Sequence, residues 1–511
     1  MKKRYFSLLV LFTPLFSFGQ ISTAQVGFNN VGAMINDGGV LFNNQATSTA
    51  GYEVPIGSGQ NAIYALSFWF GGTDINNQLK LSATTYAAQE DIFPGPSTVN
   101  TATGATQAQW PMTIFTVTQA EIDNHLLNFQ NQGYQPPASF LTWPAHGDIS
   151  QGFNFYLAPF VDYDQDGSYD PMQGDYPCIK GDYASYMIFN DTRSVHTSSF
   201  GDPLGIEVHM MIYQYASGGV LDNTTFVETT VINRGTQTLF DYIQSVFVDF
   251  DLGNYNDDYF GSDSVRNLVY AYNADAFDED AGGALGYGAT PPAIGVLSLE
   301  NDFASVGGNA GTASQTFDYY QLMQGNDVSG TPWATPFQFN GNPFTGAGSN
   351  EVTAASIPGD RRVLANMFPD TMVPGSIFKN TYAVIFNQGV DNLESVNGLL
   401  SVADSVQTIF DGMPGQTCTS PANQPIASVT SLEELDFQIS PNPSSSVFHI
   451  SSDANLAGNK LVITENSGKV VKELELSSSK QLVSVDGLSP GTYFVTIQAR
   501  SGSKVQRLIV Q

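Results

Sequence analysis

Basic, thiol and imidazole side chains are all scarce in this 511-residue sequence. It contains 18 Lys and Arg against 48 Asp and Glu, with only two cysteines and five histidines. The formal net charge of −30 argues against nucleic acid and anionic membranes as partners, because both repel an acidic protein. The same charge attracts cations, whose binding would relieve the self-repulsion. The alternative to cation binding is that the negative charge only keeps an exported protein soluble.

The two cysteines, Cys178 and Cys418, limit the chemistry that thiols can provide. Two thiols cannot form an all-cysteine zinc site, and the sequence has no CxxC motif. A disulfide between them is compatible with export, but a long separation in sequence says nothing about distance in the fold. The pairing of the two cysteines therefore stays open at this point.

Long apolar runs are missing outside the N-terminus, so no transmembrane segment is predicted. Residues 1–19 are typical of a secretory signal peptide. A basic start, Lys2 to Arg4, precedes an apolar stretch from Phe6 to Phe18 that is too short to span a bilayer. Small residues suit cleavage before Gln20, and a second option lies before Gln25. The mature chain is therefore predicted to be exported.

Charged residues make up only 13% of the chain, whereas strand formers, glycine and turn residues are abundant. This composition predicts a mainly β protein. Together with the element patterns described below, it predicts a large β-sandwich-like body with long loops and two short helices, and a small C-terminal immunoglobulin-like β-sandwich of six or seven strands. The predicted divisions are a body over 20–415, with one or two subdomains, a Pro/Ser/Thr-rich linker over 416–434 and a C-terminal domain over 435–511.

Hydrophobic periodicity places the main elements of the body. Strands are predicted for Ala62–Phe70, with a hairpin partner in Leu79–Tyr86, and for a core sheet made of Gly205–Tyr213, Thr224–Asn233 and Tyr242–Phe250. Capping boxes that begin at Thr118 and Asp391 predict helices over about 119–130 and 392–410. Residues 281–360 are rich in Gly, Asn and Pro with aromatics between them, and predict long irregular loops.

The strongest chemical motif is the acidic stretch from Val161 to Pro171. Asp162, Asp164 and Asp166 alternate before Gly167, a layout that folds a short loop into an oxygen cage for a hard divalent cation. Calcium is the predicted ion, and its role is structural. The predicted ligands in this stretch and just after it are Asp162, Asp164, Asp166, Asp170 and Asp175. The alternative is a solvated Asp/Gly turn without metal.

The acidic loop differs from an EF-hand in two respects. An EF-hand needs a bidentate Glu at loop position twelve, and that position holds Gln173. No helix signature flanks the loop on either side. The sequence therefore predicts a stand-alone calcium loop of the kind found in thrombospondin-type repeats.

A second acidic cluster follows the predicted strand Tyr242–Phe250. Asp249 and Asp251 lie on one face at the strand end, where a loop can fold back with Asp257 and Asp258. These four aspartates are predicted as further calcium ligands. They either complete the first site or form a second one.

Glu207 and His209 are two residues apart in a predicted strand and so share a face. They could act as an acid–base pair or as metal ligands, but no motif supports catalysis, and a hydrogen-bonded polar patch is the favoured interpretation. No GxSxG or HExxH motif is present. No catalytic residue is therefore assigned.

The last 75 or so residues combine specific short motifs with alternating runs that predict strands over Val447–Ser451, Lys460–Glu465, Val470–Leu476, Gln481–Val485, Thr492–Gln498 and Val505–Val510. The motifs are Ile439–Pro443, Ile463–Lys469, Leu488–Val495 and Lys504–Val510. In order and spacing this domain resembles the type A C-terminal sorting domain of the type IX (Por) secretion system of Bacteroidetes. The resemblance implies passage through the periplasm, recognition by the type IX machinery, usual removal of the domain, and a location outside the cell or on its outer surface.

The body, about residues 26–415, resembles an uncharacterised family of such exported proteins. The stretches that carry the resemblance are Trp143–Ala145, Ala158–Asp162, Gly174–Pro177, Gly205–His209, Asp249–Gly253 with Asp257 and Asp258, and Pro291–Gly295. No activity can be carried over from that family. The resemblance implies only that both acidic clusters belong to one body.

Two function classes follow from these observations. The first is a calcium-stabilised binding or adhesion protein that contacts a glycan or another cell-surface ligand. The alternative is a secreted hydrolase acting on polysaccharide or protein, which would need two carboxylates facing each other across a groove. A groove that holds Glu207, His209 and a further acid without a cation would favour the hydrolase, whereas a flat sheet with complete oxygen cages would favour the binding protein.

Overall fold

The computed structural model describes residues 22–86, 90–98, 110, 114–308, 312–413, 418, 437–452, 456–465, 469–499 and 502–511. The predicted signal peptide lies outside these residues, and so does the predicted linker except for Cys418. Within the described chain, no helix has the length and apolarity needed to cross a membrane.

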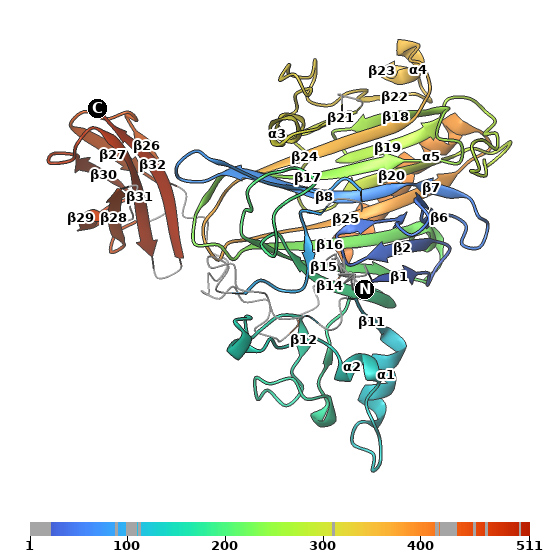
Figure 1. The fold of residues 1–511 in the computed structure, drawn as a ribbon, viewed down its shortest axis with the longest axis horizontal. Helices are drawn as coiled ribbons and strands as arrows, with labels where there is room; N and C mark the ends of the chain where they lie inside the picture. The colour runs from blue at the N-terminus through green and yellow to red at the C-terminus, as the bar shows by residue number, and fades with distance from the viewer. Residues whose placement is uncertain are drawn as a thin grey trace, which may run out of the picture.

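The body is built around two antiparallel sheets, as the mainly β prediction requires (Figure 1). The nine-stranded sheet contains, in spatial order, β10 (Phe93–Pro94), β14 (Tyr183–Asn190), β15 (Ile206–Gln214), β16 (Thr224–Asn233), β25 (Ile377–Gln388), β20 (Pro292–Ser298), β19 (Leu268–Asn273) and β18 (Asp258–Asp263), with β11 (Phe115–Thr118) also paired to β14. The six-stranded sheet contains β21 (Ser305–Gly308), β24 (Arg361–Met372), β17 (Leu239–Phe250), β8 (Ala65–Thr73) and β3 (Val40–Leu41), with β9 (Leu79–Ala83) paired to β8.

Smaller elements complete the body. A four-stranded sheet contains β1 (Thr23–Val26), β2 (Gly32–Asn36), β6 (Tyr52–Glu53) and β7 (Asn61–Ile63). Two-stranded pairs are β4 (Asn43–Asn44) with β5 (Thr49–Ala50), β12 (Phe160–Val161) with β13 (Tyr176–Pro177), and β22 (Gly341–Asn342) with β23 (Ala347–Gly348). The helices are α1 (Gln119–Asn128), α2 (Ala138–Leu141), α3 (Thr316–Met323), α4 (Glu351–Ala354) and α5 (Asn392–Gly412), with 3-10 turns η2 (Ile149–Gln151), η3 (Pro171–Gln173) and η4 (Gly219–Asn223).

Strand β15 shows why the large sheet is buried on both faces. Val208, Met210 and Ile212 belong to the core between the two sheets, whereas Met211 and Tyr213 belong to the apolar layer on the other face. Successive side chains of a strand point to opposite faces, so a strand covered on both sides is buried along its whole length, as β15 is, including its polar residues Glu207 and His209. The predicted strands over 205–250 are confirmed, but the third of them, β17, crosses into the six-stranded sheet.

Helices cover the outer faces of the sandwich. Both predicted helices are confirmed: Thr118 and Glu121 form a complete capping box at α1, and Asp391 accepts the Glu394 amide at the start of α5. Apolar residues of α5 pack on the outer face of the nine-stranded sheet. On the outer face of the six-stranded sheet, Tyr319 and Tyr320 of α3 pack against residues that include Trp69. The body therefore consists of four layers: α5, the nine-stranded sheet, the six-stranded sheet and α3.

The stretch 281–360 is more ordered than its composition predicts. It contains β20, which lies between β25 and β19 inside the nine-stranded sheet, as well as β21, α3 and α4. Two residues of β20 explain why the sequence pattern did not predict it as a strand. Pro292 is its first residue, a position that proline tolerates in a sheet. At Gly295, a Cβ atom would lie 2.8 Å from Leu268 Cδ1, so the glycine reflects close packing rather than a loop.

The C-terminal domain is a small sandwich with a core of its own. One sheet contains β26 (Gln438–Ser440), β27 (Val447–Ser451) and β30 (Lys480–Ser484); the other contains β29 (Val470–Glu475), β28 (Lys460–Glu465), β31 (Gly491–Ala499) and β32 (Gly502–Val510). These strands confirm the predicted alternating runs to within a few residues at each end.

A disulfide joins Cys178 to Cys418, which settles the pairing that the sequence left open. The two Cα atoms are 5.9 Å apart, across a sequence separation of 240. Cys178 directly follows β13 in the lower part of the body, where β12, α1 and α2 lie (Figure 1). The bridge therefore ties the chain beyond α5 to the region that carries the acidic loop.

Candidate metal centres and the acidic cavity

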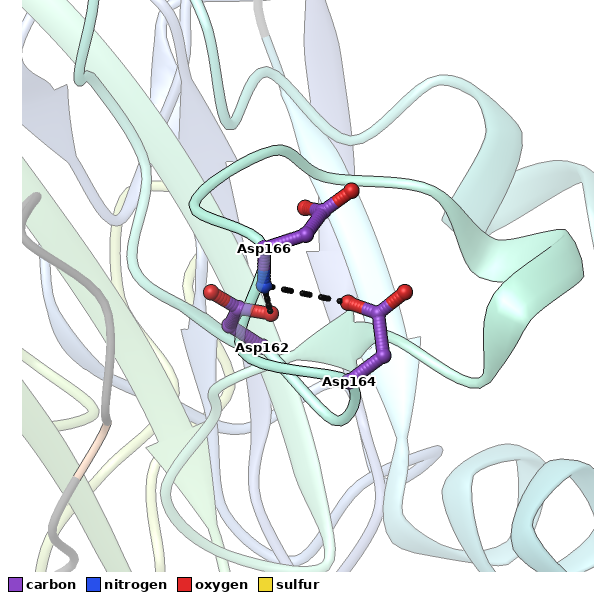
Figure 2. Close-up of side chains that lie close together, drawn as sticks. All are labelled: Asp162, Asp164 and Asp166. Carbon is purple, nitrogen blue, oxygen red and sulfur yellow. Dashed lines mark hydrogen bonds between the residues drawn. The ribbon is translucent and has the colours of Figure 1, made fainter.

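The acidic loop between β12 and η3 brings three carboxylates together. One oxygen each from Asp162, Asp164 and Asp166 lies within 4.8 Å of the other two. Figure 2 shows these side chains around the Asp166 amide, which donates to Asp162 Oδ1 at 3.2 Å and to Asp164 Oδ1 at 3.3 Å. Gln165 and Gly167 have positive φ angles of 61° and 85°, which curl the chain so that the alternate aspartates gather.

Two further predicted ligands hold the shape of this loop. Asp175 is fully buried, and its carboxylate accepts the amides of Tyr163 and Asp170, each at 2.7 Å. Asp170 in turn accepts the Met172 amide at 2.8 Å and caps η3. Burial, followed by the charges of neighbouring loop aspartates, raises the pKa of Asp175, while its two backbone hydrogen bonds lower it. The structure thus gives Asp170 and Asp175 bracing contacts, and their role as ligands stays a prediction.

A second group of carboxylates lies where β17 ends. Asp249 within β17, Asp251 just beyond it and Asp360 just before β24 each place an oxygen within 4.8 Å of the other two. Because β17 and β24 are antiparallel with Asp249 opposite Arg362, the end of one strand lies beside the start of the other. Asp249 and Asp251 therefore meet, as strand alternation predicts, and the third member of the group comes from a distant segment.

The environment of this second group is crowded and poor in positive charge. Asp249 Oδ2 accepts the Tyr86 hydroxyl and lies 3.5 Å from Arg362 Nε, while Arg362 Nη2 lies 2.6 Å from Asp360 Oδ2. Burial is the main cause that raises the pKa of Asp249 to about 7 and that of Asp251 to about 8; the charge of Asp360 adds to both. One guanidinium thus contacts two of the three carboxyl groups, Asp249 and Asp360.

A cavity of about 760 Å³ opens onto this group. Its wall includes all three carboxylates, Arg362 and three tyrosines. The rings of Tyr64 and Tyr86 meet edge to face, with centroids 5.7 Å apart. This wall combines apolar ring surface with a concentrated negative charge, and such concave sites with a few convergent polar groups are typical of ligand binding.

The other two predicted ligands of the second cluster lie beside a different partner, Asp278. Asp258 is fully buried, and its Oδ2 accepts the Leu252 amide at 3.1 Å. Burial, and then the charge of Asp278, raise the pKa of Asp257 to about 7. Gly253 permits this arrangement, because its φ is +64° and a Cβ there would lie 2.0 Å from Asp278 Oδ2. Asp257 and Asp258 are therefore neighbours of the Asp249 group rather than members of it.

The two acidic clusters are separate sites in the described structure. The loop group belongs to the β12–β13 region, whereas the Asp249 group joins the ends of β17 and β24. Asp360 and Asp278 were not predicted as partners. Asp360 directly precedes β24, and Asp278 lies between β19 and β20. The pairing of these strands cannot be predicted from local pattern, so the spacing of the aspartates in the sequence does not identify the two residues as partners.

Glu207 and His209 form part of a buried polar network. His209 Nε2 lies 2.8 Å from Glu207 Oε1, and Arg234 Nη2 donates to the same oxygen at 2.8 Å. The Ser97 amide donates to Glu207 Oε2 at 2.7 Å, and Tyr186 Oη lies 2.6 Å from His209 Nδ1. Both oxygens of the carboxylate are satisfied, and Glu207 is fully buried. These contacts fit the favoured interpretation of a hydrogen-bonded polar patch.

We expect this network to make stability depend on acid pH. Burial opposes ionisation of Glu207, but Arg234 and His209 outweigh it and hold the pKa at about 2, below the ordinary value of about 4.5. A lowered folded-state pKa stabilises the protein fully above the unfolded value, and that stability is lost as pH falls from about 4.5 toward 2. The loss attributable to Glu207 should reach about 3 kcal/mol.

Urea unfolding of the wild type and of Glu207→Gln at a series of pH values measures this dependence. The amide cannot titrate, so the difference in unfolding free energy between the two proteins should shrink as pH falls through that window. A difference that stays constant from neutral pH down to pH about 2 would show that Glu207 has an ordinary pKa.

Comparisons with known proteins bear mainly on the C-terminal domain. Residues 438–511 match the family of secretion system C-terminal sorting domains, which confirms the resemblance to type IX sorting domains and assigns export to the cell surface or the extracellular space. No curated protein matches the chain. Among solved structures, one titled as a polysaccharide lyase aligns with 10% identity and a TM-score of 0.18, covering 60% of this chain and 34% of that one. The chain thus spans about a third of the length of that structure.

Proposed function

Because residues 438–511 form a secretion-system sorting domain, we propose that this exported protein is a calcium-stabilised binding or adhesion protein, with a glycan or another cell-surface molecule as its ligand. The observation that supports this proposal best is the convergence of Asp162, Asp164 and Asp166 within 4.8 Å in a tightly turned loop. Calcium is abundant outside cells, and an exported protein can rely on it for stability.

The geometry of the loop suits calcium for a simple reason. Calcium takes six to eight oxygens at about 2.3–2.6 Å, so three oxygens within 4.8 Å of one another can all reach one ion. Asp164 and Asp166 are exposed, which leaves room for water to complete the coordination. The ion would offset repulsion among the three carboxylates, and it would fix the β12–β13 region beside the disulfide.

Removing calcium should lower the melting temperature. Extracellular calcium modules bind with Kd values of about 10⁻⁴–10⁻³ M. At a calcium concentration roughly 10 to 100 times Kd, binding adds about 1.4–2.7 kcal/mol, which corresponds to about 2–5 °C for a domain of this size. Differential scanning calorimetry in about 10 mM calcium, roughly 10 to 100 times these Kd values, and in chelator should show this shift for the wild type.

The double variant Asp164→Ala plus Asp166→Ala should reduce the calcium-induced shift. Asp327→Ala is the matched control, because Asp327 also accepts backbone amides in an exposed turn, those of Ser329 and Thr331, and belongs to neither carboxylate group. The control should keep the full shift. A double variant that responds to calcium as strongly as the wild type would rule out the loop as the stabilising site.

The alternative, a secreted hydrolase, makes different demands on the carboxylates. Inverting glycosidases separate their two carboxyl groups by about 6.5–9.5 Å to admit a water molecule, and retaining enzymes by about 5–5.5 Å. The oxygens of Asp249, Asp251 and Asp360 lie within 4.8 Å of one another. All three carboxylates can therefore reach one ion, so the group supports a cation site more directly than an acid–base pair across a scissile bond.

A further inference from the structure

Two carboxylate oxygens at the acidic cavity are buried without a hydrogen-bond donor. The Asp249 side chain is only 5% exposed, and its Oδ1 is buried with no partner among the described residues. Asp360 Oδ1, just before the start of the neighbouring strand β24, is likewise buried with no partner among the described residues. Leaving a buried polar atom unsatisfied lowers stability, and the cost is greater for a charged group. Two such oxygens in one three-carboxylate group indicate that a positive species, either a proton shared by the two carboxyl groups or a cation, belongs between them.

The charges around the group indicate what that positive species is. Three carboxylates converge, and Arg362 is the cation that pairs with two of them, Asp249 and Asp360. One guanidinium balances one carboxylate, so two negative charges remain when all three are ionised. A divalent cation neutralises this remainder, and an all-carboxylate donor set is typical of calcium rather than of zinc or copper.

The cavity provides the other half of the coordination sphere. Three monodentate aspartates supply three of the six to eight oxygens that calcium takes. Because these aspartates form part of the cavity wall together with Tyr64, Tyr86 and Arg362, an ion held by them would lie at the cavity wall, where a bound ligand would complete its coordination. An ion held in this way is both anchored by the protein and open to a ligand.

We propose that Asp249, Asp251 and Asp360 hold a calcium ion in the cavity wall, and that this ion binds a saccharide through its hydroxyl oxygens. The inference rests on the proposed calcium-dependent binding function and gives it a location. Vicinal hydroxyls can supply two oxygens to one calcium ion, and the tyrosine rings offer the apolar faces on which sugar rings pack. The loop calcium would then be structural, and the cavity calcium would take part in binding.

The metal part of the proposal is tested with calcium alone, by isothermal titration calorimetry and by equilibrium dialysis of the exported protein. The wild type should bind one more calcium ion than Asp360→Asn. Asp360 is a suitable position because its side chain is 35% exposed and lies before β24, so the variant should fold. Asp164→Ala plus Asp166→Ala should lose a different ion, and combining both changes should remove both.

Arg362→Gln is the matched control for the ion pair. It breaks the contacts with Asp249 and Asp360 but removes no oxygen ligand, so calcium should bind as well as in the wild type or more tightly. If the group is only an ion-pair network, Arg362→Gln and Asp360→Asn should instead have the same effect on calcium binding. Unchanged calcium stoichiometry in Asp360→Asn would overturn the cavity site while leaving the loop site to its own test.

The saccharide part is tested on an array of neutral and acidic oligosaccharides, in calcium and in chelator. Glycans bound by the wild type in calcium should be lost in chelator and should bind at least tenfold more weakly to Asp360→Asn, whereas Asp327→Ala should bind them normally. Binding that persists in chelator, or an array without any bound glycan, would overturn this part even if the calcium ion is present.

Discussion

Replacing Arg234 with alanine is expected to destabilise the body by about 3–5 kcal/mol, because it would strand a buried charge. Glu207 is fully buried in the nine-stranded sheet, and Arg234 contacts its Oε1 through Nε at 3.1 Å and Nη2 at 2.8 Å. Without the guanidinium, the carboxylate would keep only neutral donors and His209. Equilibrium unfolding in urea at neutral pH measures the loss.

A second substitution distinguishes the stranded charge from lost packing. In Glu207→Gln plus Arg234→Ala no buried charge remains, so much of the lost stability should return. If the double variant is as unstable as Arg234→Ala, or if the single variant loses less than about 1 kcal/mol, the pair behaves as a surface ion pair. The neutral Gln also keeps an acceptor for the Ser97 amide, which isolates the charge as the variable.

Removing the disulfide is the other change with a large expected effect. Cys178→Ser plus Cys418→Ser should lower the unfolding free energy by about 2–5 kcal/mol. The bridge closes a loop across a sequence separation of 240, and in the chain-entropy model longer loops restrict the unfolded chain more strongly. Urea unfolding of the oxidised wild type and of the double variant gives the difference.

The reduced wild type is the natural control for the cysteine variant. Treating the wild type with reductant leaves every side chain in place, so it should lose about as much stability as Cys178→Ser plus Cys418→Ser. If the double variant unfolds at the same urea concentration as the oxidised wild type, the bridge does not restrict the unfolded chain. Cys178 is 6% exposed, so serine there adds a small polar cost that the reduced wild type does not have.

Features set by neighbouring residues could be predicted from sequence. The capping boxes at Thr118 and Asp391 gave both predicted helices because cap and amide are three residues apart. In the C-terminal domain, alternation located strands such as β27 and β28. The loop over Asp162–Asp166 was found for the same reason, since its carboxylates come from one short stretch.

Features set by long-range pairing could not be predicted. Asp360 joins Asp249 only because β24 pairs with β17, and local spacing carries no record of that pairing. The sheet to which β17 belongs was predicted wrongly for a similar reason, because the apolar alternation of β17 fits either sheet of the sandwich. Strand β20 was predicted as a loop because it contains a proline and a glycine. In the structure, the proline is the first residue of the strand and the glycine lies where packing is tight.

The Cys178–Cys418 bridge also determines how the protein would respond to proteolysis. A single cut in any exposed loop between the two cysteines would leave two fragments that migrate together on a non-reducing gel and separate on a reducing one. A cut beyond Cys418 would instead release the sorting domain and leave the body covalently whole. A nicked body could therefore stay assembled outside the cell after its sorting domain has been removed.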